Sequence, residues 1–294
     1  MVICLSRGNI YQLPVWRSTV NSSFYCSDDV IGSHAGLKIL WSVMTVRVRL
    51  PLRVHSIKYS CLMNTAIITM AGKGTRTNKE VPKQFLKVSQ DKYLFEIPLD
   101  KLIRTGCYSK IVLVVNPEYV EWVNSRISHN YPGKLGRLII IIPGGDTAQQ
   151  SRILGFESLL ADEELNWPNT VTFHDGVRIG FDENLLTFMV NNCRFNGIAY
   201  VPYIPATGTL RLDSDEAVYT NDKYMRLQTP MVFPFNKFHE CYNRACYKDT
   251  VYQTASDLYE DNGGLVNYVI GNRLNFKVTF PEDIDVVRFL YNRE

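Results

Sequence analysis

The chain has 294 residues, 46% of them apolar, with 32 Lys and Arg against 29 Asp and Glu. This length allows one large α/β domain or two small ones, each with a real core. The sequence contains no run of 18 apolar residues, so it predicts no membrane-spanning helix. Residues 63–294 carry 25 basic and 27 acidic residues, a balance that excludes a general electrostatic attraction to nucleic acid.

Residues 1–62 do not resemble the start of an α/β domain. They hold seven Lys and Arg but only two Asp and Glu, without a clear helical or strand period. Three interpretations compete: a basic organelle transit peptide, a disordered arm, or an artefact of an upstream start codon. We favour the artefact because Met63 stands directly before the first convincing strand. The domain is then expected to span residues 63–294.

From Met63 onward, apolar strands alternate with amphipathic helices. The predicted strands are the apolar run Ala66–Ile68, then Ile111–Val115, Leu138–Ile142, Thr170–Phe173, Ile198–Val201, Val266–Ile270 and Phe276–Val278, and Met225–Phe233 is expected to return to the sheet. The predicted helices are Leu94–Thr105, Glu118–Ile127, a segment capped by Asp146 and ending at Leu160, Glu183–Asn192, Lys237–Tyr247, Ala255–Glu260 and Ile284–Tyr291. This alternation predicts a mostly parallel sheet covered by helices on both faces, with ligands at the carboxyl ends of its strands.

One polar, turn-rich stretch interrupts the alternation. Residues 207–222 read TGTLRLDSDEAVYTND and fit a protruding hairpin better than a strand–helix–strand unit. Such an arm commonly packs on a partner. The seven cysteines are scattered without a CxxC pair, so we expect free thiols in a cytoplasmic protein rather than a metal cluster.

The most informative stretch, residues 65–85, reads TAIITMAGKGTRTNKEVPKQF. Gly72 and Gly74 follow a strand, and Arg76 and Lys83 follow at a distance that a short loop can fold back. Glycines let backbone amides approach an anion, while fixed cations neutralise a polyphosphate. A dinucleotide fingerprint would need Gly at Thr77, which the sequence lacks. A simple Gly turn between a strand and a helix is the alternative.

Four segments together resemble the 2-C-methyl-D-erythritol 4-phosphate cytidylyltransferase family, which also includes ribitol-5-phosphate cytidylyltransferases. They are AGKGTR with VPKQF, GGDTAQQS at 144–151, HDGVR at 174–178 and NFKVTFPED at 275–283. The resemblance covers nearly all of residues 63–294. It implies a Rossmann-like nucleotidyltransferase fold, a homodimer formed through the arm, and transfer of CMP from CTP to an alditol or sugar phosphate with release of pyrophosphate.

The resemblance also implies residue roles. Arg76, Lys83 and Lys277 would neutralise charge at the reacting phosphates, and Asp175 would hold Mg2+. Thr229 and Arg178 would lie on the acceptor side; for Arg178, anchoring its own loop or the nucleotide are the alternatives. His174 is expected to be a packed or hydrogen-bonded neighbour of Asp175 rather than a ligand. The implied nucleotide-binding residues are Ala71, Gly72, Lys73, Gly74, Gly144, Gly145, Asp146 and Ser151.

The sequence departs from the family pattern mainly on the acceptor side. The Thr-Asp-Glu-Ala-Ser segment that helps hold the acceptor phosphate reads Tyr-Gln-Thr-Ala-Ser at 252–256, and a common arginine after the Gly-Gly turn is Ala148. We therefore expect a ribitol-5-phosphate-like acceptor, with 2-C-methyl-D-erythritol 4-phosphate as the alternative. A catalytically silent nucleotide-binding protein is the hypothesis from another class.

Overall fold

The computed structural model describes residues 4–6, 9–11, 63–72, 81–162, 167–207, 210–211, 218–219, 224–248 and 250–291. The chain divides into two compact units, Met1–Val54 and His55–Glu294. In the first unit, β1 (Cys4–Ser6) pairs antiparallel with β2 (Asn9–Tyr11). In the described residues, no helix is both long enough and apolar enough to cross a bilayer.

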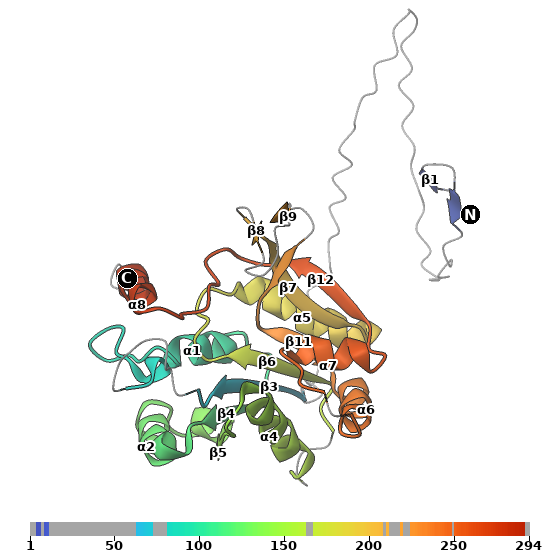
Figure 1. Ribbon diagram of the computed structural model, residues 1–294. Coiled ribbons are helices and arrows are strands. Elements are labelled where there is room, and N and C mark those ends of the chain that lie inside the picture. Colours follow the sequence, from blue (N-terminus) through green and yellow to red (C-terminus); the bar gives the residue numbers. More distant parts are fainter. Residues whose placement is uncertain are drawn as a thin grey trace, which may run out of the picture. The chain divides into compact units, whose positions relative to one another are not determined.

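The second unit contains an eight-stranded sheet with helices on both sides (Figure 1). Its strands are β3 (Asn64–Met70), β4 (Lys110–Val115), β5 (Ile139–Pro143), β6 (Thr170–Asp175), β7 (Ala199–Pro205), β10 (Met225–Leu227), β11 (Met231–Pro234) and β12 (Val266–Ile270). They run in the order β10-β7-β11-β6-β3-β4-β5, with β12 paired to β7. The mixed α/β architecture confirms the predicted fold class.

The predicted helices are all present with ends shifted by a few residues, whereas the short α3 was not predicted. The helices are α1 (Glu96–Arg104), α2 (Val120–Asn130), α3 (Lys134–Arg137), α4 (Ala148–Leu160), α5 (Glu183–Asn196), α6 (Phe235–Ala245), α7 (Ala255–Asp261) and α8 (Pro281–Tyr291), with short 3-10 turns η2 (Lys83–Phe85) and η3 (Pro117–Tyr119). Side chains of α1, α2 and α5 pack on one face of the sheet, and those of α4, α6 and α7 pack on the other.

The central strands are parallel and buried on both faces. Strand β3 pairs in parallel with β4 and β6, and β4 pairs in parallel with β5. The chain therefore leaves β3 in one direction, through β4 and β5, and then returns to β6 on the other side. A reversal of this kind opens a crevice at the carboxyl ends of the strands.

The other half of the sheet is antiparallel in part, since β11 runs against β6 and β7, and β10 runs against β7. Residues 207–222 contain the short antiparallel pair β8 (Leu210–Arg211) and β9 (Val218–Tyr219). This pair agrees with the predicted hairpin as far as the described residues extend.

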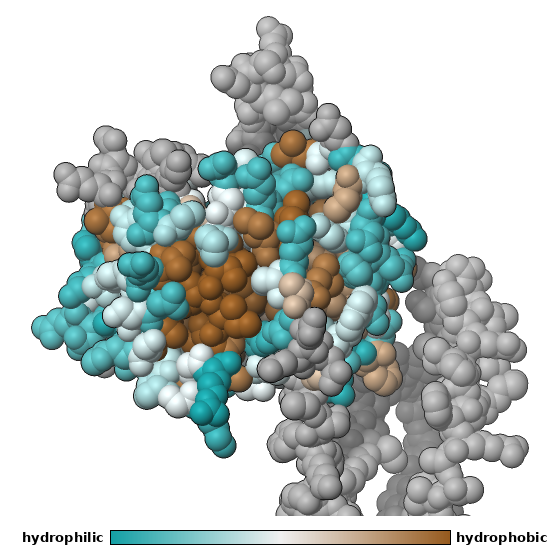
Figure 2. All heavy atoms as spheres, turned by 90° about the horizontal axis from the view of Figure 1, so that it is seen from below, coloured by the Kyte–Doolittle hydropathy of each residue, from teal (hydrophilic) through white to brown (hydrophobic). Residues whose placement is uncertain are grey.

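Strand β5 forms one edge of the sheet, and its three central isoleucines, 140–142, are only partly buried. Figure 2 shows an apolar patch on the underside of the molecule, the side on which β5 lies in Figure 1.

The prediction that Phe276–Val278 forms a last strand is wrong. Lys277 makes one isolated bridge with Arg178, because the chain then turns into α8, where Asp283 accepts hydrogen bonds from the backbone of Thr279 and Phe280.

Candidate active site

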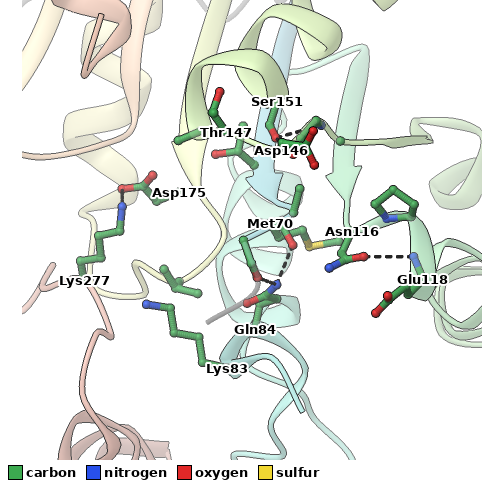
Figure 3. Close-up of a pocket in the computed structure, with 18 residues that line it drawn as sticks. Met70, Lys83, Gln84, Asn116, Glu118, Asp146, Thr147, Ser151, Asp175 and Lys277 are labelled. Carbon is green, nitrogen blue, oxygen red and sulfur yellow. Dashed lines mark hydrogen bonds and ion pairs between the residues drawn. The ribbon is translucent and has the colours of Figure 1, made fainter. Parts of the chain in front are cut away.

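A pocket with a volume of about 450 Å³ opens at the carboxyl ends of β3, β4, β5 and β6 (Figure 3). Its size is that of an ordinary small-molecule site. Its lining residues are Thr69, Met70, Ala71, Gly72, Lys83, Gln84, Asn116, Pro117, Glu118, Gly144, Gly145, Asp146, Thr147, Ala148, Ser151, Asp175, Val177 and Lys277. We call residues 70–72, 116–118 and 144–151 the loop wall, and Asp175, Arg178 and Lys277 the ion-pair cluster.

The loop wall begins where β3 ends. The buried side chain of Gln84 donates hydrogen bonds to the carbonyl oxygens of Met70, at 2.7 Å, and Gly72, at 2.8 Å. These bonds tie the start of the glycine loop to the turn η2. That turn also carries Lys83, which is 9% exposed and lines the pocket. In the view of Figure 3, Lys83 lies across the pocket from Asp146.

The Gly-Gly turn after β5 lies very close to this loop. The amide of Gly144 donates to the carbonyl of Val115 at 2.7 Å, and a Cβ atom at Gly144 would lie only 2.3 Å from the Cβ atom of Ala71. Any larger residue would push the two loops apart. Ser151, which is buried, places its hydroxyl 3.2 Å from the amide of Gly145. The glycines therefore let two strand ends share one wall.

The prediction that Asp146 caps α4 is wrong. Thr147 is the N-cap, and its hydroxyl accepts a hydrogen bond from the amide of Gln150 while the Gln150 side chain accepts one from the amide of Thr147. This is a capping box. Asp146 is exposed and lines the pocket, so its carboxylate is available to a ligand.

Sequence reasoning missed the contribution of β4 to the wall. Asn116, Pro117 and Glu118 line the pocket, and the Asn116 side chain accepts a hydrogen bond from the Glu118 amide at 3.0 Å. The local signal for this loop is Asn-Pro directly after the predicted strand Ile111–Val115. Gln84 lies within the VPKQF motif, but the sequence alone assigns it no role.

The ion-pair cluster lies at the end of β6. The Oδ2 atom of Asp175 lies 3.0 Å from the Arg178 Nε atom and 3.3 Å from the Lys277 Nζ atom. Burial alone would raise the pKa of the Asp175 carboxyl, but the charges of Lys277 and Arg178 more than offset this effect and hold the pKa well below its usual range. The carboxylate is therefore ionised throughout the neutral pH range.

Arg178 anchors this region rather than facing the pocket. In addition to Asp175, its guanidinium donates to the backbone carbonyls of Asn275, at 3.1 Å, and Leu227, at 3.4 Å. The arginine thus joins three segments that lie far apart in the chain. Its position agrees with the loop-anchoring alternative that the sequence left open.

A buried hydrogen-bond chain orients Asp175. His174 is 1% exposed, and its Nε2 atom lies 3.0 Å from the carbonyl oxygen of Arg178. A carbonyl only accepts, so Nε2 carries the proton in the neutral ring and Nδ1 accepts from the Thr229 hydroxyl, 3.0 Å away. That hydroxyl accepts in turn from the Asp175 amide at 3.1 Å. Burial lowers the pKa of His174 to about 4, so the ring is neutral near pH 7.

The structure brings most of the predicted site residues together. Ala71, Gly72, Lys83, Gly144, Gly145, Asp146, Ser151, Asp175 and Lys277 all line the pocket. Thr229 and Arg178 form hydrogen bonds with Asp175 but do not line the pocket themselves. Lys73, Gly74 and Arg76 lie outside the described residues.

The pocket can accommodate a metal only together with a ligand. Among the described residues, no three His, Cys, Asp or Glu side chains lie close enough to hold an ion by themselves. Both ion pairs of Asp175 use Oδ2, which leaves Oδ1 as the potential metal ligand. A hard dication bound by one carboxylate plus substrate phosphates needs no larger protein set. The residues therefore fit such an ion.

Comparisons with a family model, with related sequences and with solved structures all indicate the same family. The family model for 2-C-methyl-D-erythritol 4-phosphate cytidylyltransferase matches residues 64–293. Proteins of that name from Desulforamulus reducens and Thermotoga neapolitana are 30% and 28% identical, over 78% of this chain and 95% and 96% of theirs. The crystal structure of 4-diphosphocytidyl-2C-methyl-D-erythritol synthase from Anaerococcus prevotii is 25% identical with a TM-score of 0.64, over 79% of this chain and 96% of that one.

The match extends from the first central strand to the last helix, and the four sequence motifs lie within it. The chain is a CTP-dependent nucleotidyltransferase and belongs to the 2-C-methyl-D-erythritol 4-phosphate cytidylyltransferase family.

Proposed function

We propose that this chain transfers CMP from CTP to 2-C-methyl-D-erythritol 4-phosphate. The observation that carries the proposal is the match of residues 64–293 to one family model, together with relatives of that name aligned over nearly their whole length. These comparisons support this acceptor better than the ribitol-5-phosphate that we expected from the altered 252–256 segment.

The geometry of that segment weakens the argument for ribitol phosphate. Thr254 is the N-cap of α7, with its hydroxyl accepting from the Asp257 amide at 3.1 Å. Tyr252, a second departure, is buried, and its hydroxyl donates to the carboxylate of Asp261 at the end of α7 at 2.7 Å. At least two of the five residues therefore serve the fold of α7. A departure from the family pattern at these positions is then poor evidence for a different acceptor.

In the proposed reaction, a phosphate oxygen of the acceptor attacks the α-phosphorus of CTP. A new P–O bond forms, the bond to the β-phosphate oxygen breaks, and pyrophosphate leaves with that bonding pair. No covalent enzyme intermediate is needed, so the protein supplies positioning and charge neutralisation.

The loop wall and the ion-pair cluster then have separate tasks. The loop wall binds the nucleotide, with Lys83 on the phosphates and the turn at Gly144 and Gly145 against the base and ribose. Lys277 approaches the reacting phosphates from the opposite side, and we assign Arg76, in the undescribed part of the glycine loop, to the same task. Asp175 would hold the metal, for which we propose Mg2+. When bound, this ion neutralises charge on the phosphate oxygens.

We further infer that residues 63–294 form the catalytic unit and that the arm at 207–222 joins two copies into a homodimer. The antiparallel pair β8–β9 supports the arm as a structural element. The family resemblance is the reason for assigning it to dimer contacts.

The proposal is tested by following pyrophosphate release with CTP, Mg2+ and a panel containing 2-C-methyl-D-erythritol 4-phosphate, D-ribitol 5-phosphate and other polyol phosphates. We expect the first acceptor to give the highest kcat/KM. Lys83→Ala should lower kcat by roughly a hundred- to a thousand-fold, as expected for loss of a preorganised charge. The matched control is Lys87→Ala, because Lys87 is exposed and lies outside the pocket. A higher kcat/KM with ribitol phosphate would overturn the proposed acceptor.

A further inference from the structure

Arg152 is a cation next to the pocket for which neither the motifs nor the proposed mechanism gives a role. It lies on α4, one helical turn after Ala148, which lines the pocket together with Ser151. Side chains on a helix lean toward its N-terminus. The small side chain of Ala148 therefore leaves room for Arg152 to extend back along α4 toward the rim of the pocket.

The guanidinium of Arg152 is partly buried without an acidic partner. Its Nη2 atom donates to the carbonyl oxygen of Tyr252 at 2.8 Å. Among the described residues, it forms no ion pair within 4.0 Å. Burial lowers its pKa, and attraction to Asp175 and Asp257 only partly opposes that effect. Removing a cation from water without a counter-ion is costly, and a bound anion would offset the cost.

The neighbours of Arg152 belong to the acceptor side. Gln149, on the same turn of α4, accepts from the amide of Tyr252 at 2.7 Å and donates to the carbonyl of Thr250 at 3.4 Å. Arg152 and Thr254 also line one small cavity of about 20 Å³. The first turns of α4 thus hold the 250–254 loop, the start of the segment in which this chain departs from the family pattern.

We propose that Arg152 binds the phosphate of the acceptor, its guanidinium turning from the Tyr252 carbonyl toward the pocket. The inference rests on the proposed function, because it requires a phosphorylated acceptor beside Asp175. A guanidinium suits this task because it presents several N–H donors in a plane that matches phosphate oxygens. Arg152 then provides on α4 a charge that the sequence Tyr-Gln-Thr-Ala-Ser at 252–256 does not offer.

Three variants separate charge from loop anchoring. Arg152→Gln removes the charge but keeps a donor for the Tyr252 carbonyl, Arg152→Lys keeps the charge, and Gln149→Ala removes the other bonds to the loop. We expect Arg152→Gln to raise the KM for the acceptor by roughly ten- to a hundred-fold, the effect of losing a charged hydrogen bond. The KM for CTP should stay within about two-fold of the wild-type value, and Arg152→Lys should recover most of the loss.

The assays use whichever acceptor phosphate the wild-type chain converts best, so that the two proposals can fail separately. Preference of the wild type for another acceptor overturns the proposed function but still allows the test of Arg152. An unchanged acceptor KM in Arg152→Gln overturns the role of Arg152 alone. An equal rise of the acceptor KM in Gln149→Ala, with both variants showing the same thermal melting temperature, would show that Arg152 merely anchors the loop.

Discussion

The two sides of the pocket are built in different ways. The loop wall consists largely of backbone and of glycines that let two loops approach, as at Gly144 and Ala71. The ion-pair cluster depends on side chains that meet across long stretches of sequence. Thr229 lies 54 residues from Asp175, and the Asn275 carbonyl that accepts from Arg178 lies 97 residues away.

This difference explains why the loop wall can be predicted from the sequence more completely than the ion-pair cluster. A backbone wall needs a few glycines and a helix cap at fixed local spacing, and such patterns are visible in one segment at a time. A side-chain cluster needs partners whose proximity follows from the order of the strands. Motifs in the sequence identify the residues of the ion-pair cluster, but they do not show which atoms of these residues are in contact.

The largest effect is expected at His174, the buried neighbour of the ion-pair cluster, at low pH. Because the pKa of His174 is about 4 in the folded chain, against about 6.5 when unfolded, the unfolded chain binds more protons between these values. Stability from the neutral ring is complete above pH 6.5 and is lost as the pH falls. We expect a loss of about 3 kcal/mol between pH 7 and pH 4, measured by urea unfolding.

A matched variant tests this assignment. His174→Asn should be less stable at pH 7 but should lose less stability on acidification. An equal pH dependence in the two proteins would mean that other groups cause it. It would also remove the contrast between a pH-sensitive cluster and a pH-insensitive backbone wall.

The next effect concerns Thr229, whose hydroxyl links Asp175 to His174. Thr229→Val keeps the shape but leaves the Asp175 amide and His174 Nδ1 atom without this partner. Because Thr229 is only partly buried, the two lost partners should together cost about 2 kcal/mol of unfolding free energy, the low end of the range for unsatisfied groups. Since the carboxylate is then less well oriented, kcat should also fall. Thr229→Ser retains the hydroxyl and should behave like the wild type; a similar loss in both variants would argue against the hydrogen-bond chain.

The smallest effect is expected at the loop wall. Gly144→Ala would place a methyl group 2.3 Å from the Cβ atom of Ala71, and we expect overpacking to cost roughly 1–3 kcal/mol in all. The displaced loops should raise the KM for CTP while leaving the KM for the acceptor nearly unchanged. Gly72→Ala is the control for stability, since nothing lies within 4 Å of a Cβ atom there. A rise in the acceptor KM alone would contradict the division of labour between the loop wall and the ion-pair cluster.

The errors in the sequence predictions have local physical causes. Asp146 and Thr147 are both good helix caps, and only the backbone path after Gly145 decided that Thr147 accepts the Gln150 amide. Phe276–Val278 has the composition of a strand, yet it pairs at a single residue because the chain turns into α8. Neither outcome follows from composition.

The alternation of strands and helices, the glycine loops and the family can all be recognised in the amino-acid sequence, because each of these is encoded by local spacing or by motifs in a fixed order. Tertiary structure decided that β6 lies beside β3, that Asp175 faces both Arg178 and Lys277, and that Arg152 meets the carbonyl of Tyr252. Those contacts join residues up to about a hundred positions apart, and they form only when the strand order brings the segments together.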